Sequence, residues 1–303
     1  MAIPVLTQEE SIVNNFKSEI ISEIIVSMRK NIEEEIHNQL KNTQLKNNRV
    51  SPAFVVGINH RGWHQAPENT LTAFKESKQN GFEFVETDVR FTFDGVPVLL
   101  HDSTINRTAR NTDGTAIDKT VNIREITYEE ALKYDFGIWK GNQFSGTRIA
   151  GFNDFILLCK RLKMHPFIEL MEGSREEISF LVETVKQYGM KGHVTWISFS
   201  SALLDYVKEC DESASLGYLV IPPVTEKHIS VVKDLRTEFN YVFLDSSRNL
   251  DKKDIQMCIE AGIPLMVWIV NSEADILSLD PYVSGVTSDR LNVNEVFQKH
   301  YLP

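Results

Sequence analysis

The sequence predicts an α/β fold: a (β/α)8 TIM barrel with a small insertion after its second strand, preceded by a long N-terminal helix. First, short apolar runs with strand character alternate with helical segments eight times between residue 53 and the end of the 303-residue chain. Second, residues 90–150 interrupt this alternation and are too long for a plain connection, which indicates an insertion over one mouth of the barrel. Third, residues 8–48 contain neither Gly nor Pro, as expected of one continuous helix.

The N-terminal segment, residues 1–50, is predicted to begin its helix after Thr7, with Glu10 three residues later in a capping-box pattern. Its apolar residues are mostly four positions apart, so the apolar stripe drifts by about 40° per step around the helix. A heptad repeat drifts the other way, so a standard left-handed coiled coil is not expected. An exposed stripe of this kind needs a partner. Two partners stay open: other copies of the chain, for instance in a trimer, or the catalytic domain predicted at residues 51–303.

Eight short segments, most of them rich in β-branched and aromatic residues, predict the strands of the barrel. They cover residues 54–59, 82–89, 166–170, 193–198, 214–220, 241–245, 264–270 and 284–288. Helices are predicted between them at residues 71–79, 152–163, 175–188, 200–209, 226–235, 252–261 and 290–299. Active sites of such barrels lie at the C-terminal ends of the strands, so polar residues at those ends are the candidate site residues.

The composition indicates a soluble globular protein, with 42% hydrophobic residues, 24% charged residues and a net charge of −10. An acidic chain is a poor candidate for binding nucleic acid or an anionic membrane. We find no membrane span and no signal peptide, so we expect a cytoplasmic protein, or a virion-associated one if a phage encodes it. The three cysteines are widely spaced and predict neither a disulfide framework nor a zinc site.

Three carboxylates at predicted strand ends indicate a metal site. Glu86 and Asp88 are two residues apart on one strand, so both point into the barrel. Two inward carboxylates repel each other, and a divalent cation between them removes that cost. Glu169 on the neighbouring strand completes an all-oxygen set suited to Ca²⁺ or Mg²⁺. The alternative is that one carboxylate pairs with Arg61 and the other is solvated.

Two histidines are the candidates for proton transfer, because imidazole titrates near neutral pH. His60 follows the first strand and His101 follows a short apolar run that leads to the same mouth. Arg61 offers a planar fork for phosphate oxygens. Glu68 and Asn69 are expected either to ligate the metal or to orient Arg61 and His60.

Two further strand ends carry candidate residues for the substrate pocket or for support of the site. Trp268 lies near the end of the seventh predicted strand, and Asp289 follows the eighth. His64 is close to His60 in sequence, and we expect it only near the site.

Three motifs together resemble the signature of the glycerophosphodiester phosphodiesterases. They are H-R-G-x(4)-P-E-N-T at His60–Thr70, E-T-D-V at Glu86–Val89 and T-x-D-G-V-P-V-x(2)-H-D at Thr92–Asp102. The segments "PFIEL", "VWIVN" and "GVTSDR" resemble later strands of that family, so the resemblance covers about residues 54–298. It implies a (β/α)8 barrel with an insertion after the second strand.

The resemblance also implies a role for each matching residue. It implies Glu86, Asp88 and Glu169 as ligands of Ca²⁺ or Mg²⁺, His60 and His101 as the catalytic pair, Arg61 at the phosphate, Glu68 at the metal site and Trp268 in the substrate pocket. The implied reaction cleaves a glycerol phosphodiester to sn-glycerol 3-phosphate and an alcohol. In the implied route a neighbouring glycerol hydroxyl attacks the phosphorus first, giving a cyclic phosphate that water then opens. One position departs from the family pattern: its E-x-K on the third strand is here Glu169-Leu170-Met171.

Three kinds of function stay open on these residues. The substrate is either a glycerophosphate polymer such as wall teichoic acid or a small intracellular glycerophosphodiester. The long helix slightly favours the polymer, since a self-associating helix ahead of a hydrolase resembles a phage tail component. A third possibility, suggested by Met171, is a polymer-binding module with weak or no catalysis.

Overall fold

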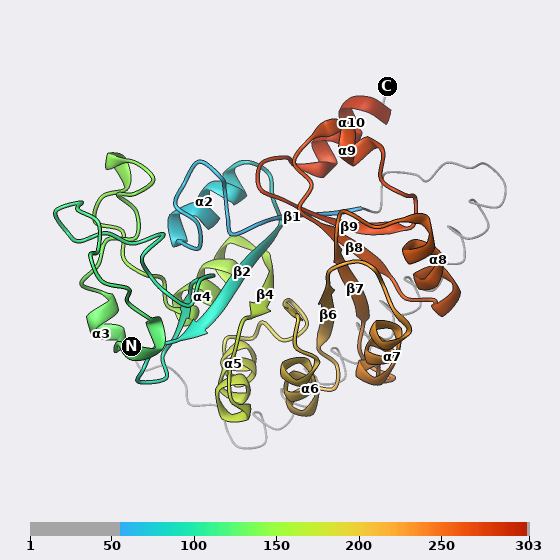
Figure 1. Ribbon diagram of the computed structural model, residues 1–303, viewed down its shortest axis with the longest axis horizontal. Helices are drawn as coiled ribbons and strands as arrows, with labels where there is room; N and C mark the ends of the chain where they lie inside the picture. Colours follow the sequence, from blue (N-terminus) through green and yellow to red (C-terminus); the bar gives the residue numbers. More distant parts are fainter. Residues whose placement is uncertain (1–54, 302–303) are drawn as a thin grey trace, which may run out of the picture. The chain divides into compact units, whose positions relative to one another are not determined.

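The computed structural model describes residues 55–301, and the predicted N-terminal helix lies outside them. Eight parallel strands form a closed barrel, because the first strand pairs with both the second and the last (Figure 1). The predicted TIM barrel is therefore confirmed. The strands are β1 (Val56–Asn59), β2 (Phe84–Phe91), β4 (His165–Leu170), β5 (Thr195–Ser198), β6 (Ser215–Val220), β7 (Val242–Ser247), β8 (Leu265–Trp268) and β9 (Val283–Ser288).

Helices follow the strands and pack on the outside of the barrel. They are α2 (Leu71–Gln79), α4 (Phe152–Leu162), α5 (Arg175–Gln187), α6 (Ser201–Cys210), α7 (Glu226–Leu235), α8 (Lys252–Ala261), α9 (Glu273–Leu277) and α10 (Val293–Tyr301). Figure 1 shows α5, α6 and α7 side by side on the outer face. The short α9 was not predicted, and α10 begins three residues later than expected. Between residues 55 and 301, no helix has the length and hydrophobicity that crossing a bilayer requires.

The insertion after β2 has a hydrophobic core of its own. The chain turns back into β3 (Pro97–Leu99), which pairs antiparallel with the end of β2 and so extends that strand beyond its predicted end. Short helical turns follow: η2 (Ile123–Glu125), α3 (Tyr128–Ala131) and η3 (Asn142–Phe144). The buried side chains of this core are Val98, Leu100, Ile105, Ala109, Ile123, Ala131, Phe136 and Ile149. Figure 1 shows the insertion, in teal to green, as a lobe beside β2.

The interior of the barrel is packed rather than hollow. Six apolar side chains fill it, namely Ile58, Phe167, Ile197, Leu219, Phe243 and Met266. Because side chains alternate along a strand, the next inward position lies two residues further towards the C-terminal mouth. On β4 and β7 that position holds an acid, Glu169 after Phe167 and Asp245 after Phe243. The apolar layer is therefore the floor of a polar site.

A single methyl group added to this floor is expected to destabilise the protein. In a Gly217→Ala variant the new Cβ would lie 2.4 Å from Cζ of Phe243 and 2.8 Å from Cγ2 of Ile197, so the core must shift. We expect a loss of about 1 to 3 kcal/mol in the free energy of unfolding, measured by urea denaturation. Gly151→Ala is the control, since its new Cβ meets nothing closer than 3.4 Å. Equal effects of the two changes would contradict the packing described.

Candidate active site

Three carboxylates meet at the C-terminal mouth of the barrel. Glu86 and Asp88 both point inward from β2, and Glu169 is the register partner of Asp88 on β4. One oxygen atom from each lies within 4.8 Å of the other two. Glu86 and Asp88 are buried, with 3% and 0% of their surface exposed. The structure thus brings together the three residues that the sequence suggested as metal ligands.

The charges of this cluster are not balanced by the protein alone. Burial raises the pKa of Glu86 well above its ordinary value, and the charges of Asp88 and Glu169 raise it further. Burial and the charge of Asp88 raise the pKa of Glu169 to about 8. Oε1 of Glu86 and Oδ1 of Asp88 are buried, and neither receives a hydrogen bond from the residues described. Buried oxygens left without donors and a shared negative charge fit a hard divalent cation.

His60 lies next to the cluster, at the point where the barrel closes. Its backbone N–H donates to the carbonyl oxygen of Ser288 at 3.0 Å. Its Nδ1 lies 2.6 Å from Oδ1 of Asp289, and its Nε2 lies 3.9 Å from Oε2 of Glu86. Asn271 donates to the other oxygen of Asp289 at 2.5 Å. Burial raises the pKa of Asp289, but the hydrogen bond and the charge of His60 outweigh this effect and lower it. Asp289 therefore holds the imidazole ring in one orientation.

The loop after β1 folds back onto the carboxylates through Arg61. Its backbone N–H donates to Oε2 of Glu86 at 3.0 Å, and its Nε lies 3.1 Å from Oδ2 of Asp88. Its Nη1 donates to Glu68 at 3.2 Å. Arg61 has a positive φ of 53°, a conformation that costs a non-glycine residue free energy and that often occurs at functional sites. Pairing of one carboxylate with Arg61, which the sequence left open, occurs at Asp88.

Other residues of the loop after β1 hold Asp88 and the start of α2 in place. Asn69, also at positive φ (56°), donates to Oδ2 of Asp88 at 2.7 Å, so it orients a carboxylate. Thr70 caps α2 by accepting the N–H of Ala73 at 3.2 Å. Gly62 has a φ of 85°, and a Cβ there would lie 2.6 Å from that of Ala73. The glycine of the H-R-G motif is therefore required by a turn that packs on the start of α2.

His101 reaches the mouth from the insertion, two residues beyond β3. Its Nδ1 lies 2.7 Å from Oδ1 of Asp102, and its carbonyl oxygen accepts a hydrogen bond from Nε of Arg90 at 2.8 Å. The preceding residue, Leu100, donates its N–H to the carbonyl oxygen of Asp88 at 3.0 Å. Thus β2 supplies two carboxylates and also anchors the segment that carries this histidine.

Two other predicted residues lie outside the carboxylate cluster. Trp268 ends β8, where its ring packs edge to face on Phe199 with centroids 5.8 Å apart. Its Nε1 donates to the carbonyl oxygen of Asp245 at 3.3 Å. His64 has its ring against Trp63. These positions suit a wall of the pocket better than a direct part in proton transfer.

The sequence reasoning missed two charged residues. Asp245 is only 1% exposed, and its Oδ1 has no hydrogen-bond partner in the described part of the chain. Burial raises its pKa to about 8. A signal existed, because Asp245 ends a predicted strand just as Glu169 nearly does. Arg107, in the insertion, bridges Glu68 and Asp102, and no spacing rule marks it in the sequence.

Known proteins are similar to this chain in both sequence and fold. Residues 60–293 match the glycerophosphoryl diester phosphodiesterase family. A glycerophosphodiester phosphodiesterase of Caldanaerobacter subterraneus is 28% identical over 244 residues, which cover 77% of this chain and 93% of that protein. A crystal structure of a Silicibacter pomeroyi protein assigned to the same activity has a TM-score of 0.72 at 23% identity, covering 84% of this chain and 97% of that one. An Oleispira antarctica phosphodiesterase, solved in complex with its product sn-glycerol-3-phosphate, has a TM-score of 0.68 at 23% identity and covers 80% and 96%.

Proposed function

Since the chain belongs to the glycerophosphoryl diester phosphodiesterase family and is a phosphoric diester hydrolase, we propose that it cleaves glycerophosphodiesters with the help of one divalent cation. The observation that carries the metal requirement is the cluster of Glu86, Asp88 and Glu169, with buried oxygens that receive no donor from the described residues. These three residues would hold Ca²⁺ or Mg²⁺. When bound, the ion would neutralise charge that develops on the phosphate and orient the attacking hydroxyl group.

The two histidines would move the protons. One accepts the proton of the attacking hydroxyl group, and the other donates a proton to the oxygen of the leaving alcohol. Nδ1 of His60 is held by Asp289 and Nδ1 of His101 by Asp102. In each ring, Nε2 is therefore the nitrogen that remains available to contact the substrate.

Arg61 would be the main cationic side chain for the phosphate. The lysine that is usual in the family two residues after the β4 glutamate is replaced here by Met171. Arg61 already lies at the cluster, 3.1 Å from Asp88, and its guanidinium can bind two phosphate oxygens at once. Trp268 would line the substrate pocket.

For the substrate, we favour a glycerophosphate polymer such as wall teichoic acid over a small glycerophosphodiester. The support is the apolar stripe of residues 8–48, since association through it, for instance as a trimer, would hold several active sites on one repeating chain. A virion-associated location fits this substrate, and a cytoplasmic one fits the small molecule. The product sn-glycerol-3-phosphate in the Oleispira antarctica enzyme is compatible with either.

Phosphorus NMR tests these proposals together. The protein is mixed with glycerophosphocholine or with poly(glycerophosphate) teichoic acid, each with Ca²⁺, with Mg²⁺ or with EDTA. We expect a phosphate monoester signal only with a metal ion, and a faster appearance from the polymer. Equal rates in EDTA would contradict the metal requirement. A faster reaction with glycerophosphocholine would contradict the polymer.

A further inference from the structure

One guanidinium joins the barrel to the insertion at the edge of the active site. Nη1 and Nη2 of Arg107 donate to the two carboxylate oxygens of Glu68 at 2.8 and 2.7 Å. Its Nε and Nη2 donate to the two oxygens of Asp102 at 2.6 and 3.2 Å. Four charge-assisted hydrogen bonds from one side chain fix the distance between its two partners far better than a single ion pair does.

Each partner of Arg107 leads directly to a proposed functional group. Asp102 holds Nδ1 of His101 at 2.7 Å. Glu68 accepts a hydrogen bond from Arg61, which in turn contacts the metal-site carboxylates. The contacts therefore run without a gap from the carboxylate cluster on the barrel to the imidazole on the insertion.

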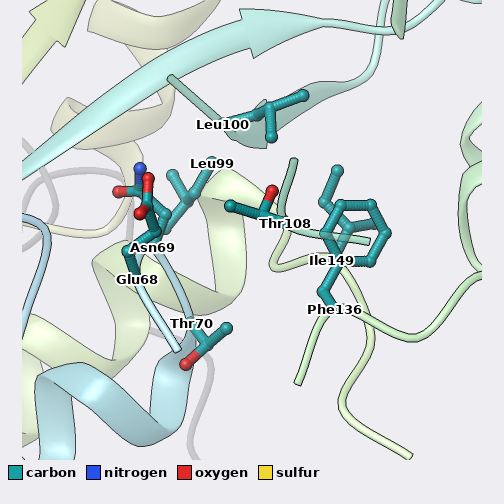
Figure 2. Close-up of a pocket in the computed structure, with 8 residues that line it drawn as sticks. All are labelled: Glu68, Asn69, Thr70, Leu99, Leu100, Thr108, Phe136 and Ile149. Atoms are coloured by element: carbon teal, nitrogen blue, oxygen red, sulfur yellow. The ribbon is translucent and has the colours of Figure 1, made fainter. Parts of the chain in front are cut away.

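Apolar side chains do not completely fill the space between the loop after β1 and the insertion. A small cavity lies between the loop after β1 and the insertion, as Figure 2 shows. Its lining comes from both sides: Glu68, Asn69 and Thr70 from the loop, and Leu99, Leu100, Thr108, Phe136 and Ile149 from β3 and the insertion. The hydrogen bonds of Arg107, which precedes Thr108, add a polar link between the two sides of this cavity.

The backbone of His101 is held by other groups. Arg90 binds its carbonyl oxygen, and the N–H of Leu100 is bound to β2. These backbone bonds do not restrict rotation of the His101 imidazole about its side-chain torsions. The partner that limits this rotation is Asp102, and Arg107 holds Asp102 in place.

We propose that Arg107 is a positioning residue: through Asp102 it fixes the imidazole of His101 in the orientation and tautomer that proton transfer requires. Asp102 is only partly buried and would otherwise exchange its partner for water. The hydrogen bonds from Arg107 lower the pKa of this carboxyl to about 2, and they hold its oxygens in place so that one of them can accept the Nδ1–H of His101. A histidine held in this way keeps Nε2 available for the substrate. The inference rests on the proposed role of His101.

The test compares Arg107→Met, Asp102→Asn and the double variant, with glycerophosphocholine as substrate and saturating metal ion. We expect each single change to lower kcat by about 10- to 100-fold, with KM changed less than about 3-fold. Because both act on the same ring, the double variant should lose no more than either single variant. Added guanidinium ion should restore part of kcat to Arg107→Met. Calorimetric titration should give an unchanged metal affinity.

The matched control is Arg148→Met, since Arg148 is also in the insertion and its contacts within residues 55–301 are one hydrogen bond, to the carbonyl oxygen of Tyr134, and an attraction to Asp135, neither of which leads to His101. It should keep wild-type kcat and the same melting temperature. A rise in KM with constant kcat in Arg107→Met would mean that the side chain binds the substrate, and multiplied losses in the double variant would mean independent roles. Either result overturns the inference. A His101→Asn variant distinguishes failure of the proposed role of His101 from failure of the role inferred for Arg107. If His101→Asn is fully active, the proposed role of His101 is wrong. If His101→Asn is inactive while Arg107→Met has normal activity, only the inference about Arg107 is wrong.

Discussion

Replacement of His60 by alanine is expected to lower kcat by about 10²- to 10⁴-fold, the range that one acid–base group contributes. The ring lies between Asp289, at 2.6 Å, and Glu86, at 3.9 Å, which is where a group that moves protons next to a metal ion must stand. The backbone N–H of His60 still pairs with β9, so the barrel should close normally. Initial rates by phosphorus NMR give kcat, and calorimetry should show that the ion still binds.

His64→Ala is the control for this change, because it removes an imidazole from the same loop. The ring of His64 packs against Trp63 and has no contact with the carboxylate cluster among the interactions observed in the described residues. We expect kcat to change by less than about 3-fold, which corresponds to less than about 1 kcal/mol, because the change removes only a packing contact with Trp63. If His60→Ala retains normal turnover, or if the two variants lose activity equally, the assignment of His60 to proton transfer is wrong.

Removal of the metal ion should abolish turnover and also change how stability depends on pH. The pKa of Glu169 is raised to about 8, and that of Glu86 is raised as well, so the folded protein without metal binds more protons than the unfolded chain. The contribution of these two glutamates to the free energy of unfolding therefore falls as pH rises from about 4.3, the value for an unfolded glutamate, to about 8. A bound cation replaces those protons. At one fixed concentration of Ca²⁺ or Mg²⁺, about a hundredfold above the Kd at pH 8, the gain in melting temperature should thus be larger at pH 8 than at pH 5, by about 5 to 10 °C.

Two variants separate the contributions to this pH dependence. Asp245, whose pKa is also about 8, lowers stability over the same range whether or not the ion is present, so only the difference between metal-free and metal-loaded curves reports on the cluster. Asp245→Asn should flatten both curves and, because the charge of Asp245 also raises the pKa of Glu169, should reduce the difference without removing it. Glu86→Gln should remove the difference together with the activity, and should make the metal-free protein more stable at pH 8 because one buried charge is gone. A gain in melting temperature that is the same at every pH would contradict a cation at these carboxylates.

The sequence was sufficient for the barrel because its signals are local and repeated. Each strand is a short apolar run, and each helix has its own start and stop residues, so the predicted helix at residues 71–79 agrees with α2 at both ends. Local signals fail where a long-range partner decides the end of an element. Strand β2 runs to Phe91 because it pairs with β3, and the five-residue α9 is too short to show a periodicity.

The candidate site could be predicted where two rules act together. Alternation along a strand placed Glu86 and Asp88 on one face, and the adjacency of parallel strands brought Glu169 to them. Alternation also points Asp245 inward, but β7 is a neighbour of neither β2 nor β4 in the sheet, so the second rule did not mark it. Arg107 could not be predicted from the sequence for another reason. Its role depends on where the insertion folds back, and that is set by a separate hydrophobic core rather than by strand spacing.

The pairing of β1 with β9 makes the orientation of His60 depend on the last strand of the barrel to be synthesised. His60 meets Asp289 across 229 residues of sequence, and the N–H of His60 pairs with Ser288. A nascent chain on the ribosome therefore carries the cluster of Glu86, Asp88 and Glu169 well before it carries an oriented His60. Closure of the barrel is therefore the folding step that brings His60 and Asp289 together.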